Sequence, residues 1–239
     1  MKNYYSIPKK SLRIFFCLFT SIIFVQCASF FSPEPEFESI RLGNREFMSK
    51  NLDVSIFRNG DSIPYAPTHE DWQRAAEEKK PAWCYPIRKL EDGGKLYNYY
   101  AVADSRGLAP EGWRIPSYED WSGLVATMII DLKSPTEALD SEKRAEYRAL
   151  VGRSLKAKAH WTDGGNGTNQ SGFNALPVGD RMDSGPFVNS FGDCARYWSK
   201  KTESLEELNC FSLVFFDDFP EWDQYCEPGD GLSVRCIKE

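Results

Sequence analysis

The most regular hydrophobic pattern in the chain follows Ser117. Apolar side chains recur there at the spacing of one helical face, at Tyr118, Trp121, Leu124, Val125, Met128 and Ile129. This spacing predicts an amphipathic helix. Ser117 and Asp120 have the spacing of a capping box, so the helix is expected to begin at this serine. Other helices are predicted at residues 69–80, 96–104 and, more highly charged, 141–150.

Strand patterns lie at both ends of the remaining chain. Residues 40–47 place apolar positions on both sides of Gly43-Asn44, a pair typical of two-residue hairpin turns. Residues 211–216 form an apolar run, and residues 232–236 alternate apolar and polar side chains. Helices that come early and strands that come late favour an α+β fold.

The N-terminus has the pattern of a secretory signal. An apolar run at residues 14–25 follows basic residues with no acidic one, and it is shorter than the ~20 residues that a membrane-spanning helix needs. Gln26-Cys27 follows directly and resembles a bacterial lipoprotein signal, although Phe24 and Gln26 depart from its common form. We expect residues 1–26 to be removed and Cys27 to be acylated. The alternatives are an uncleaved signal anchor and ordinary secretion.

Charge limits the partners of the mature chain. The whole sequence has 29 basic and 35 acidic residues. Removal of residues 1–26 takes away four basic residues and leaves a net charge of −10. Such a chain is poorly suited to nucleic acid or to anionic lipid, so its membrane attachment is expected to come from acyl chains. Residues 27–39 carry two prolines and three acids and predict an extended tether before one domain at residues 40–239.

Seven strings in the same order resemble one bacterial family. They lie at residues 43–52, 57–64, 96–102, 107–116, 171–179, 197–199 and 232–236. In this order they are similar to the Fibrobacter succinogenes major paralogous domain, a family of secreted and lipid-anchored proteins. Residues 131–150 look like an insertion.

The resemblance implies a fold and a cellular place. That family is distantly similar to C-type-lectin-like domains and to formylglycine-generating enzymes. The resemblance therefore implies an α+β, C-type-lectin-like domain, with a short twisted antiparallel sheet, two main flanking helices, and N- and C-terminal strands side by side. It also implies a protein of the cell envelope, with the outer membrane or the cell surface as its expected location.

The same resemblance implies two disulfides. Outside the signal and Cys27, five cysteines remain in an oxidising compartment. The C-type-lectin-like pattern implies the pairs Cys84–Cys236 and Cys210–Cys226. Connectivity cannot be read from sequence, and buried, unpaired cysteines remain the alternative.

No catalytic or metal-binding motif emerges from the residues. Formylglycine-generating chemistry needs closely spaced reactive cysteines, and the late cysteines here lie ten or more residues apart. Asp217, Asp218, Asp223 and Asp230 supply oxygen ligands that calcium could use. The separate glycine-rich residues 163–169 have the composition of a calcium loop but no EF-hand spacing, which is more typical of a surface turn. Acidic loop residues on an acidic chain are more often solvated. His69 and His160 fit no metalloenzyme spacing.

Three tryptophans lie outside the family strings. Trp72, Trp83 and Trp222, with Asp223 beside the last, are candidate ligand contacts, because exposed aromatic residues suit carbohydrate stacking and protein hot spots. We expect a non-catalytic envelope lipoprotein that binds an unknown protein or glycan at the cell surface, without a cofactor. The alternatives are a divergent oxidoreductase of the formylglycine-generating type and a purely structural envelope protein.

Overall fold

The computed structural model of the chain describes Met1 and residues 37–132, 140–187, 191–201, 208–223 and 226–239. It divides into two units, Met1–Glu36 and Phe37–Glu239, and the second holds the described helices and strands. Cys27 and most of the predicted signal and tether lie outside the described residues. None of the helices in the described ranges has the length and apolar composition needed to cross a bilayer.

Four helices are present in the described ranges: α1 His69–Glu77, α2 Tyr99–Val102, α3 Tyr118–Leu132 and α4 Ser141–Leu155. The predicted capping box of α3 is confirmed. The backbone N–H of Asp120 donates to Ser117 Oγ at 3.3 Å, and that of Ser117 donates to a carboxylate oxygen of Asp120 at 2.9 Å. Burial would raise the pKa of Asp120, but its bonds with Arg114 and Ser117 lower it.

The prediction of one helix at residues 96–104 is wrong at its start. Strand β4, Leu96–Tyr97, pairs there with β3, Trp83–Cys84. Helix α2 begins only after Asn98, whose side-chain oxygen accepts the backbone N–H of Ala101 at 3.1 Å. An asparagine that caps a helix marks its boundary, and the apolar residues before it are free to join a sheet.

The two ends of the domain meet in a four-stranded sheet. Its strands run in the order β1 Ser39–Leu42, β2 Arg45–Met48, β9 Ile237–Lys238 and β5 Trp113–Arg114. The predicted hairpin at residues 40–47 is therefore confirmed. β2 and β9 are antiparallel neighbours, as the family resemblance implied.

The predicted strand at residues 232–236 is shifted. Strand β9 begins only at Ile237. The preceding residues form isolated bridges to two separate segments, since Leu232 pairs with Tyr97 and Ser233 with Tyr197. Alternation of apolar and polar side chains thus reflects an extended segment that crosses between sheets, and not one regular strand.

A second sheet carries the described part of the C-terminal third. It contains β6 Cys194–Trp198, β7 Cys210–Val214 and β8 Asp217–Asp223 in sequence order. The apolar run at residues 211–216 was predicted as strand throughout, but β7 ends at Val214 and the chain turns there into β8.

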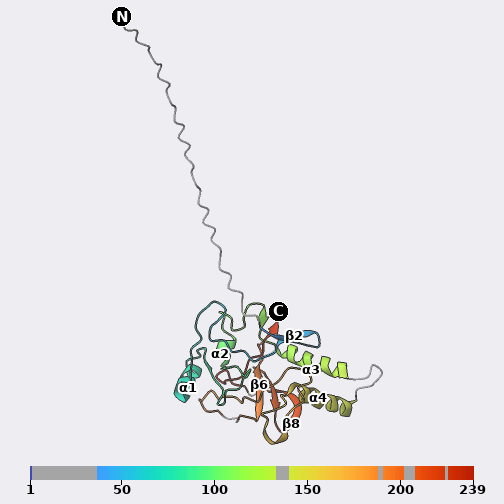
Figure 1. Cartoon of the computed structure of the whole chain (residues 1–239). Helices are drawn as coiled ribbons and strands as arrows, with labels where there is room; N and C mark the ends of the chain where they lie inside the picture. Colours follow the sequence, from blue (N-terminus) through green and yellow to red (C-terminus); the bar gives the residue numbers. More distant parts are fainter. Residues whose placement is uncertain (2–36, 133–139, 188–190, 202–207, 224–225) are drawn as a thin grey trace. The chain divides into compact units, whose positions relative to one another are not determined.

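Helix α4 packs on β8, and α3 lies beside α4 (Figure 1). Gly152 explains how close this packing is. A Cβ atom at this position would lie 1.8 Å from the backbone oxygen of Asp218. Glycine usually weakens a helix, but here its missing side chain lets the helix backbone approach the strand.

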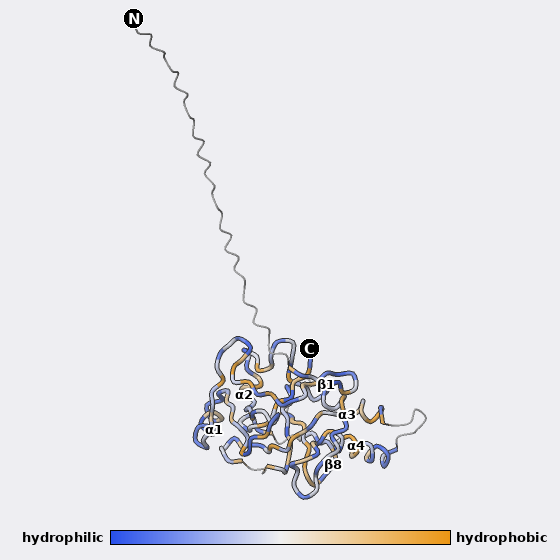
Figure 2. The backbone as a smooth tube through the Cα atoms, viewed as in Figure 1, coloured by the Kyte–Doolittle hydropathy of each residue, from blue (hydrophilic) through white to orange (hydrophobic). Residues whose placement is uncertain are grey.

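Aromatic side chains form the centre of the core. Trp121 on α3 stacks on Phe211 of β7, with ring centroids 4.6 Å apart and an interplanar angle of 4°. Phe47, Phe173 and Tyr197 surround this pair, at centroid distances of 5.4 to 6.1 Å from Trp121. In contrast to this apolar centre, Figure 2 shows α1 mainly in the hydrophilic colours.

The helices and sheets described above make the domain mixed α/β, with small antiparallel sheets and four helices among the described residues.

Candidate functional site

A cleft of about 300 Å³ lies beside the turn that joins β7 to β8. We call it the Phe216 cleft. Its lining residues include Arg153, Asp163, Asn166, Phe216, Asp217 and Asp218, together with two glycines. One wall is the turn itself, and the other is the loop that contains the short 3-10 helix Thr162–Gly164.

The loop wall depends on glycine and on a side chain that bonds to the backbone. A Cβ atom at Gly165 would lie 2.5 Å from the backbone oxygen of Phe215, so only glycine allows the two walls to approach this closely. The side-chain oxygen of Asn166 accepts the backbone N–H of Trp161 at 3.1 Å. These features hold the loop against the β7–β8 turn.

An ion network forms the base of the Phe216 cleft. Asp218 accepts two bonds from Arg153, at 3.1 and 2.8 Å, and one from Lys156 Nζ at 3.1 Å. Lys156 is fully buried and also donates to the backbone oxygen of Asp217 at 2.7 Å. Burial lowers the pKa of Lys156, although Asp218 acts in the opposite direction. Together with Asp163 and Asp217 on the lining, three carboxylates therefore largely compensate two cations at this site.

The residues that line the cleft include an exposed aromatic ring and acidic side chains. The Phe216 side chain is 75% exposed and meets the ring of Phe215 edge-on, with centroids 5.2 Å apart. Asp163 and Asp217 also line the cleft, and a carboxylate oxygen of Asp217 accepts the backbone N–H of Phe219 at 2.9 Å. A ring face next to hydrogen-bonding groups can hold a ligand that has both a C–H face and polar substituents.

A second cleft, of about 270 Å³, lies between α1, α2 and two loops. Glu77, Asp183 and Glu227 make its lining acidic. Asp230 joins the loops, because its carboxylate accepts the backbone N–H groups of Asp183 and Glu227 at 3.1 and 3.0 Å. Burial raises the pKa of Asp230 to about 6, against the effect of these two bonds.

The oxygen ligands considered for calcium are dispersed. Asp217 and Asp218 lie at the Phe216 cleft, where Asp218 is neutralised by two cations, whereas Asp230 joins the loops of the other cleft. Asp223 lies in β8, but its side chain is outside the described part. Within the described residues, no group of three or more His, Cys, Asp or Glu side chains could hold a metal ion.

The predicted surface tryptophans are largely inside the domain. Trp72 is fully buried, and its Nε1–H donates to the backbone oxygen of Gly229 at 2.9 Å, so its prediction as a surface contact is wrong. Trp222 is half-buried and packs edge-on against Phe211. Trp83 is also buried, and the exposed ring of Tyr65 lies over it with the two ring centroids 4.5 Å apart.

One of the two predicted disulfides is present. Cys210 and Cys226 are bonded, and the guanidinium of Arg196 lies 3.2 and 3.4 Å from their sulfurs. The predicted pair Cys84–Cys236 is wrong, since both are free and buried thiols. The physical reason is their placement: Cys84 belongs to the core cluster around Trp121, and Cys236 belongs to a separate cluster.

Native Cys84 and Cys236 are expected to resist alkylation at pH 8. Burial raises the pKa of the Cys84 thiol to about 11 and that of the Cys236 thiol to about 12, so the reactive thiolate is scarce. Iodoacetamide treatment followed by peptide mass analysis should find both unmodified in folded protein and both modified after denaturation. Labelling of either one in the folded protein would contradict this expectation.

Sequence reasoning missed Tyr65 and Phe216 as exposed aromatic residues. Phe216 belongs to an apolar run that suggests a buried strand, and only the turn after Val214 brings it out to solvent. Tyr65 lies between prolines at positions 64 and 67. That spacing favours an extended segment. It was the one signal in the sequence that bears on the placement of Tyr65.

Comparison with known proteins identifies a family and no nearer relative. The family model described as the Fibrobacter succinogenes major domain matches residues 40–238. No curated protein matches the chain, and no solved structure matches it either.

Proposed function

Because the chain belongs to the Fibrobacter succinogenes major domain family, we propose that it is a non-catalytic envelope lipoprotein whose domain binds glycans at the cell surface. The observation that carries this proposal is the exposed ring of Phe216 at the rim of a polar, charge-compensated cleft.

A sugar ring suits the Phe216 cleft in shape and in polarity. A pyranose presents one face of C–H groups and a periphery of hydroxyls that both donate and accept hydrogen bonds. The Phe216 ring can cover the C–H face, while Asp163, Asn166 and Arg153 provide acceptors and donors for the hydroxyls. Compensated charges at the base favour a neutral ligand over an ion. The volume of about 300 Å³ is at the lower end of ligand pockets, which fits one or two sugar rings.

A binding role is better supported than thiol chemistry. Formylglycine-generating enzymes require a pair of reactive cysteines, whereas Cys84 and Cys236 are buried and lie in different core clusters. The pairing of β2 with β9 supports a C-type-lectin-like arrangement for the domain. Glycan recognition at the Phe216 cleft would not depend on a metal ion.

Membrane attachment through Cys27 forms part of the proposal. Its support is the sequence alone, in which a short apolar run ends directly at Gln26-Cys27. Labelling of growing cells with radioactive palmitate should mark the wild-type protein and should not mark Cys27→Ser. Label that persists on Cys27→Ser would exclude acylation at this position.

A glycan array probed with the detergent-solubilised full chain tests the proposed function. We expect at least one glycan to bind. Phe216→Ala should lower the affinity for it about tenfold, or ~1.4 kcal/mol, and Phe216→Tyr should retain binding because the ring remains. Both variants should melt at the wild-type temperature, since the side chain is exposed.

Ile130→Ala is the matched control, because it removes an exposed apolar side chain on α3 that does not line the cleft. An array without any bound glycan would overturn the proposal. Equal affinities of Phe216→Ala and wild type would also overturn it.

A further inference from the structure

A charged side chain lies against the Cys210–Cys226 disulfide. This bond joins the first residue of β7 to the segment that follows β8. Arg196 belongs to β6, the strand that pairs with β7. Its Nη2 lies 3.2 Å from the sulfur of Cys210 and 3.4 Å from the sulfur of Cys226. The guanidinium therefore faces both sulfur atoms of the bond.

Two further contacts hold this guanidinium in place. Its Nη1 donates to a carboxylate oxygen of Asp180 at 2.7 Å, and its Nε donates to Ser212 Oγ at 3.3 Å. The side chains of Arg196 and Asp180 are 11% and 5% exposed, so little water screens their charges. The fold thus fixes the position of Nη2 beside the sulfurs before any thiol reacts.

The contact favours the reduced cysteines over the disulfide. A disulfide sulfur is a neutral and weak acceptor, so a guanidinium beside it gains little. A thiolate carries a full negative charge, and its hydrogen bond with a guanidinium is charge-assisted and stronger. An arginine next to a cysteine is one of the features that stabilise a thiolate at neutral pH. Arg196 therefore stabilises a thiolate product more than it stabilises the bond that is present.

We propose that the Cys210–Cys226 disulfide is a redox-active site, which small thiols open in the folded domain, and that Arg196 stabilises the thiolate that leaves. Cys226 is 5% exposed, whereas Cys210 is fully buried in the central strand of its sheet. Attack is therefore expected at the sulfur of Cys226. This inference goes beyond glycan binding and does not rest on it.

Reduction by a dithiol proceeds in two exchange steps. A thiolate of the reagent attacks Sγ of Cys226, the bond between the two cysteines breaks, and its electron pair leaves on Cys210 as a thiolate beside Arg196. The second thiolate of the reagent then attacks the reagent's own sulfur in the mixed disulfide and releases Cys226 as a thiolate. The dithiol loses two electrons and becomes a cyclic disulfide, the two cysteines gain these electrons, and the protons of the dithiol pass to solvent or to the new thiolates.

Opening of the bond would release one wall of the second cleft. Glu227, Pro228 and Gly229 follow Cys226 directly and belong to the lining of that cleft. The bond from the backbone N–H of Glu227 to Asp230 would remain, but the covalent connection of this loop to β7 would be lost. The redox state of the surroundings would therefore determine how firmly this wall is held.

Equilibration of the full chain in detergent with mixtures of reduced and oxidised dithiothreitol tests the inference. Each mixture is quenched with acid, and free thiols are alkylated in denaturant and assigned by peptide mass analysis. We expect the wild-type disulfide to open without denaturant. Half reduction of Arg196→Met should require a ratio of reduced to oxidised reagent about tenfold higher or more, since a charge-assisted bond is lost. Arg196→Lys should lie between the two, because an ammonium keeps the charge and lacks the planar fork.

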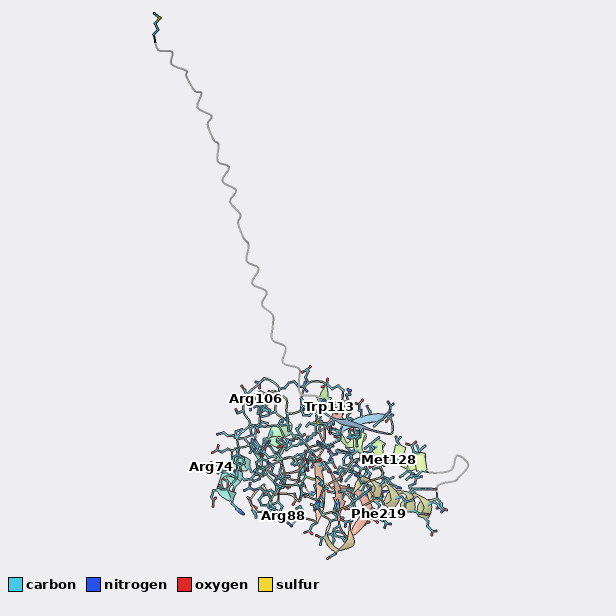
Figure 3. All side chains as sticks on the ribbon, in the orientation of Figure 1. Arg74, Arg88, Arg106, Trp113, Met128 and Phe219 are labelled. Atoms are coloured by element: carbon cyan, nitrogen blue, oxygen red, sulfur yellow. A yellow bond between two sulfur atoms is a disulfide. The ribbon has the colours of Figure 1, made fainter. Side chains whose placement is uncertain are left out.

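The direction of this shift separates the proposal from a merely structural role of Arg196. A variant that only loosened the fold would expose the disulfide and make it easier to reduce. Ser212→Ala is the matched control, because it removes one bond to the guanidinium and keeps its charge, so it should shift the ratio less than Arg196→Met. Arg74→Met removes a surface arginine, which Figure 3 shows on α1 at the edge of the domain, and should stay within about twofold of wild type.

A wild-type disulfide that opens only in denaturant would overturn the inference. Half reduction of both Arg196 variants at the wild-type ratio, or below it, would overturn it as well, because the guanidinium would then not favour the thiolate. Neither result bears on the glycan array, which tests the Phe216 cleft separately.

Discussion

Trp121→Ala is expected to lower the free energy of unfolding by about 3–5 kcal/mol, the range for large aromatic side chains removed from a core. Trp121 is fully buried at the centre of the domain and stacks face to face on Phe211. Three more rings surround this pair, namely Phe47 of β2, Tyr197 of β6 and Phe173. Alanine would leave a cavity that these elements, each fixed by its own sheet or loop, can fill only in part.

Denaturant titration followed by circular dichroism measures this effect. Ile130→Ala is the matched control, since Ile130 lies on the same helix but is exposed, and its change should stay within about 0.5 kcal/mol. A loss below about 1 kcal/mol in Trp121→Ala would show that the aromatic cluster does not hold α3 to the β6–β8 sheet.

Local signals in the sequence were enough to place α3. Ser117 and Asp120 are three residues apart, and their reciprocal bonds form without help from the rest of the fold. The hairpin β1–β2 is likewise fixed by its turn, where Gly43 adopts a φ of +57°. Elements of this kind can be predicted because the residues that define them are neighbours in sequence.

Elements that depend on distant partners were mispredicted. Leu96 has an apolar helical neighbourhood in sequence, but it forms a strand because Cys84, twelve residues earlier, is available for pairing. Residues 232–236 alternate as a strand would, but their partners belong to two segments, around residues 97 and 197. No local pattern contains this information.

The candidate site likewise combines features that are visible in the sequence with an arrangement that depends on distant partners. The sequence marked the glycine-rich residues 163–169 and the acids at 217 and 218 as separate features, and the structure brings them together in the Phe216 cleft. Exposure of Phe216 depends on a turn within an apolar run. The tryptophans were misjudged because burial follows from packing, as for Trp72 beneath Arg181, and not from their distance from family strings.

A buried arginine makes several contacts of this distant kind. Arg235 is 1% exposed, and burial lowers its pKa. Its guanidinium donates twice to the side-chain oxygen of Asn51, at 3.0 and 2.6 Å, and to the backbone oxygens of Phe173 and Ser49 at 2.6 and 3.1 Å. It therefore ties the C-terminal segment to two loops that are far away in sequence.

Arg235→Met is accordingly expected to destabilise the domain by about 3–5 kcal/mol, because several buried, neutral oxygens lose their hydrogen-bond donor at once. Methionine fills much of the same volume but leaves the oxygens of Asn51 and Phe173 buried without this donor, and each such loss costs about 1–3 kcal/mol. Arg235→Lys should lie between wild type and Arg235→Met, because an ammonium keeps the charge and lacks the planar fork.

Calorimetric melting should show a decrease of roughly 6–20 °C for Arg235→Met. Arg74→Met on α1 is the control, since Arg74 pairs with Asp71 on the surface, where an ion pair contributes about 0–1 kcal/mol. An unchanged melting temperature for Arg235→Met would mean that water or other donors satisfy these oxygens. The buried guanidinium would then contribute no net stability, since its desolvation would cancel the bonds that it makes.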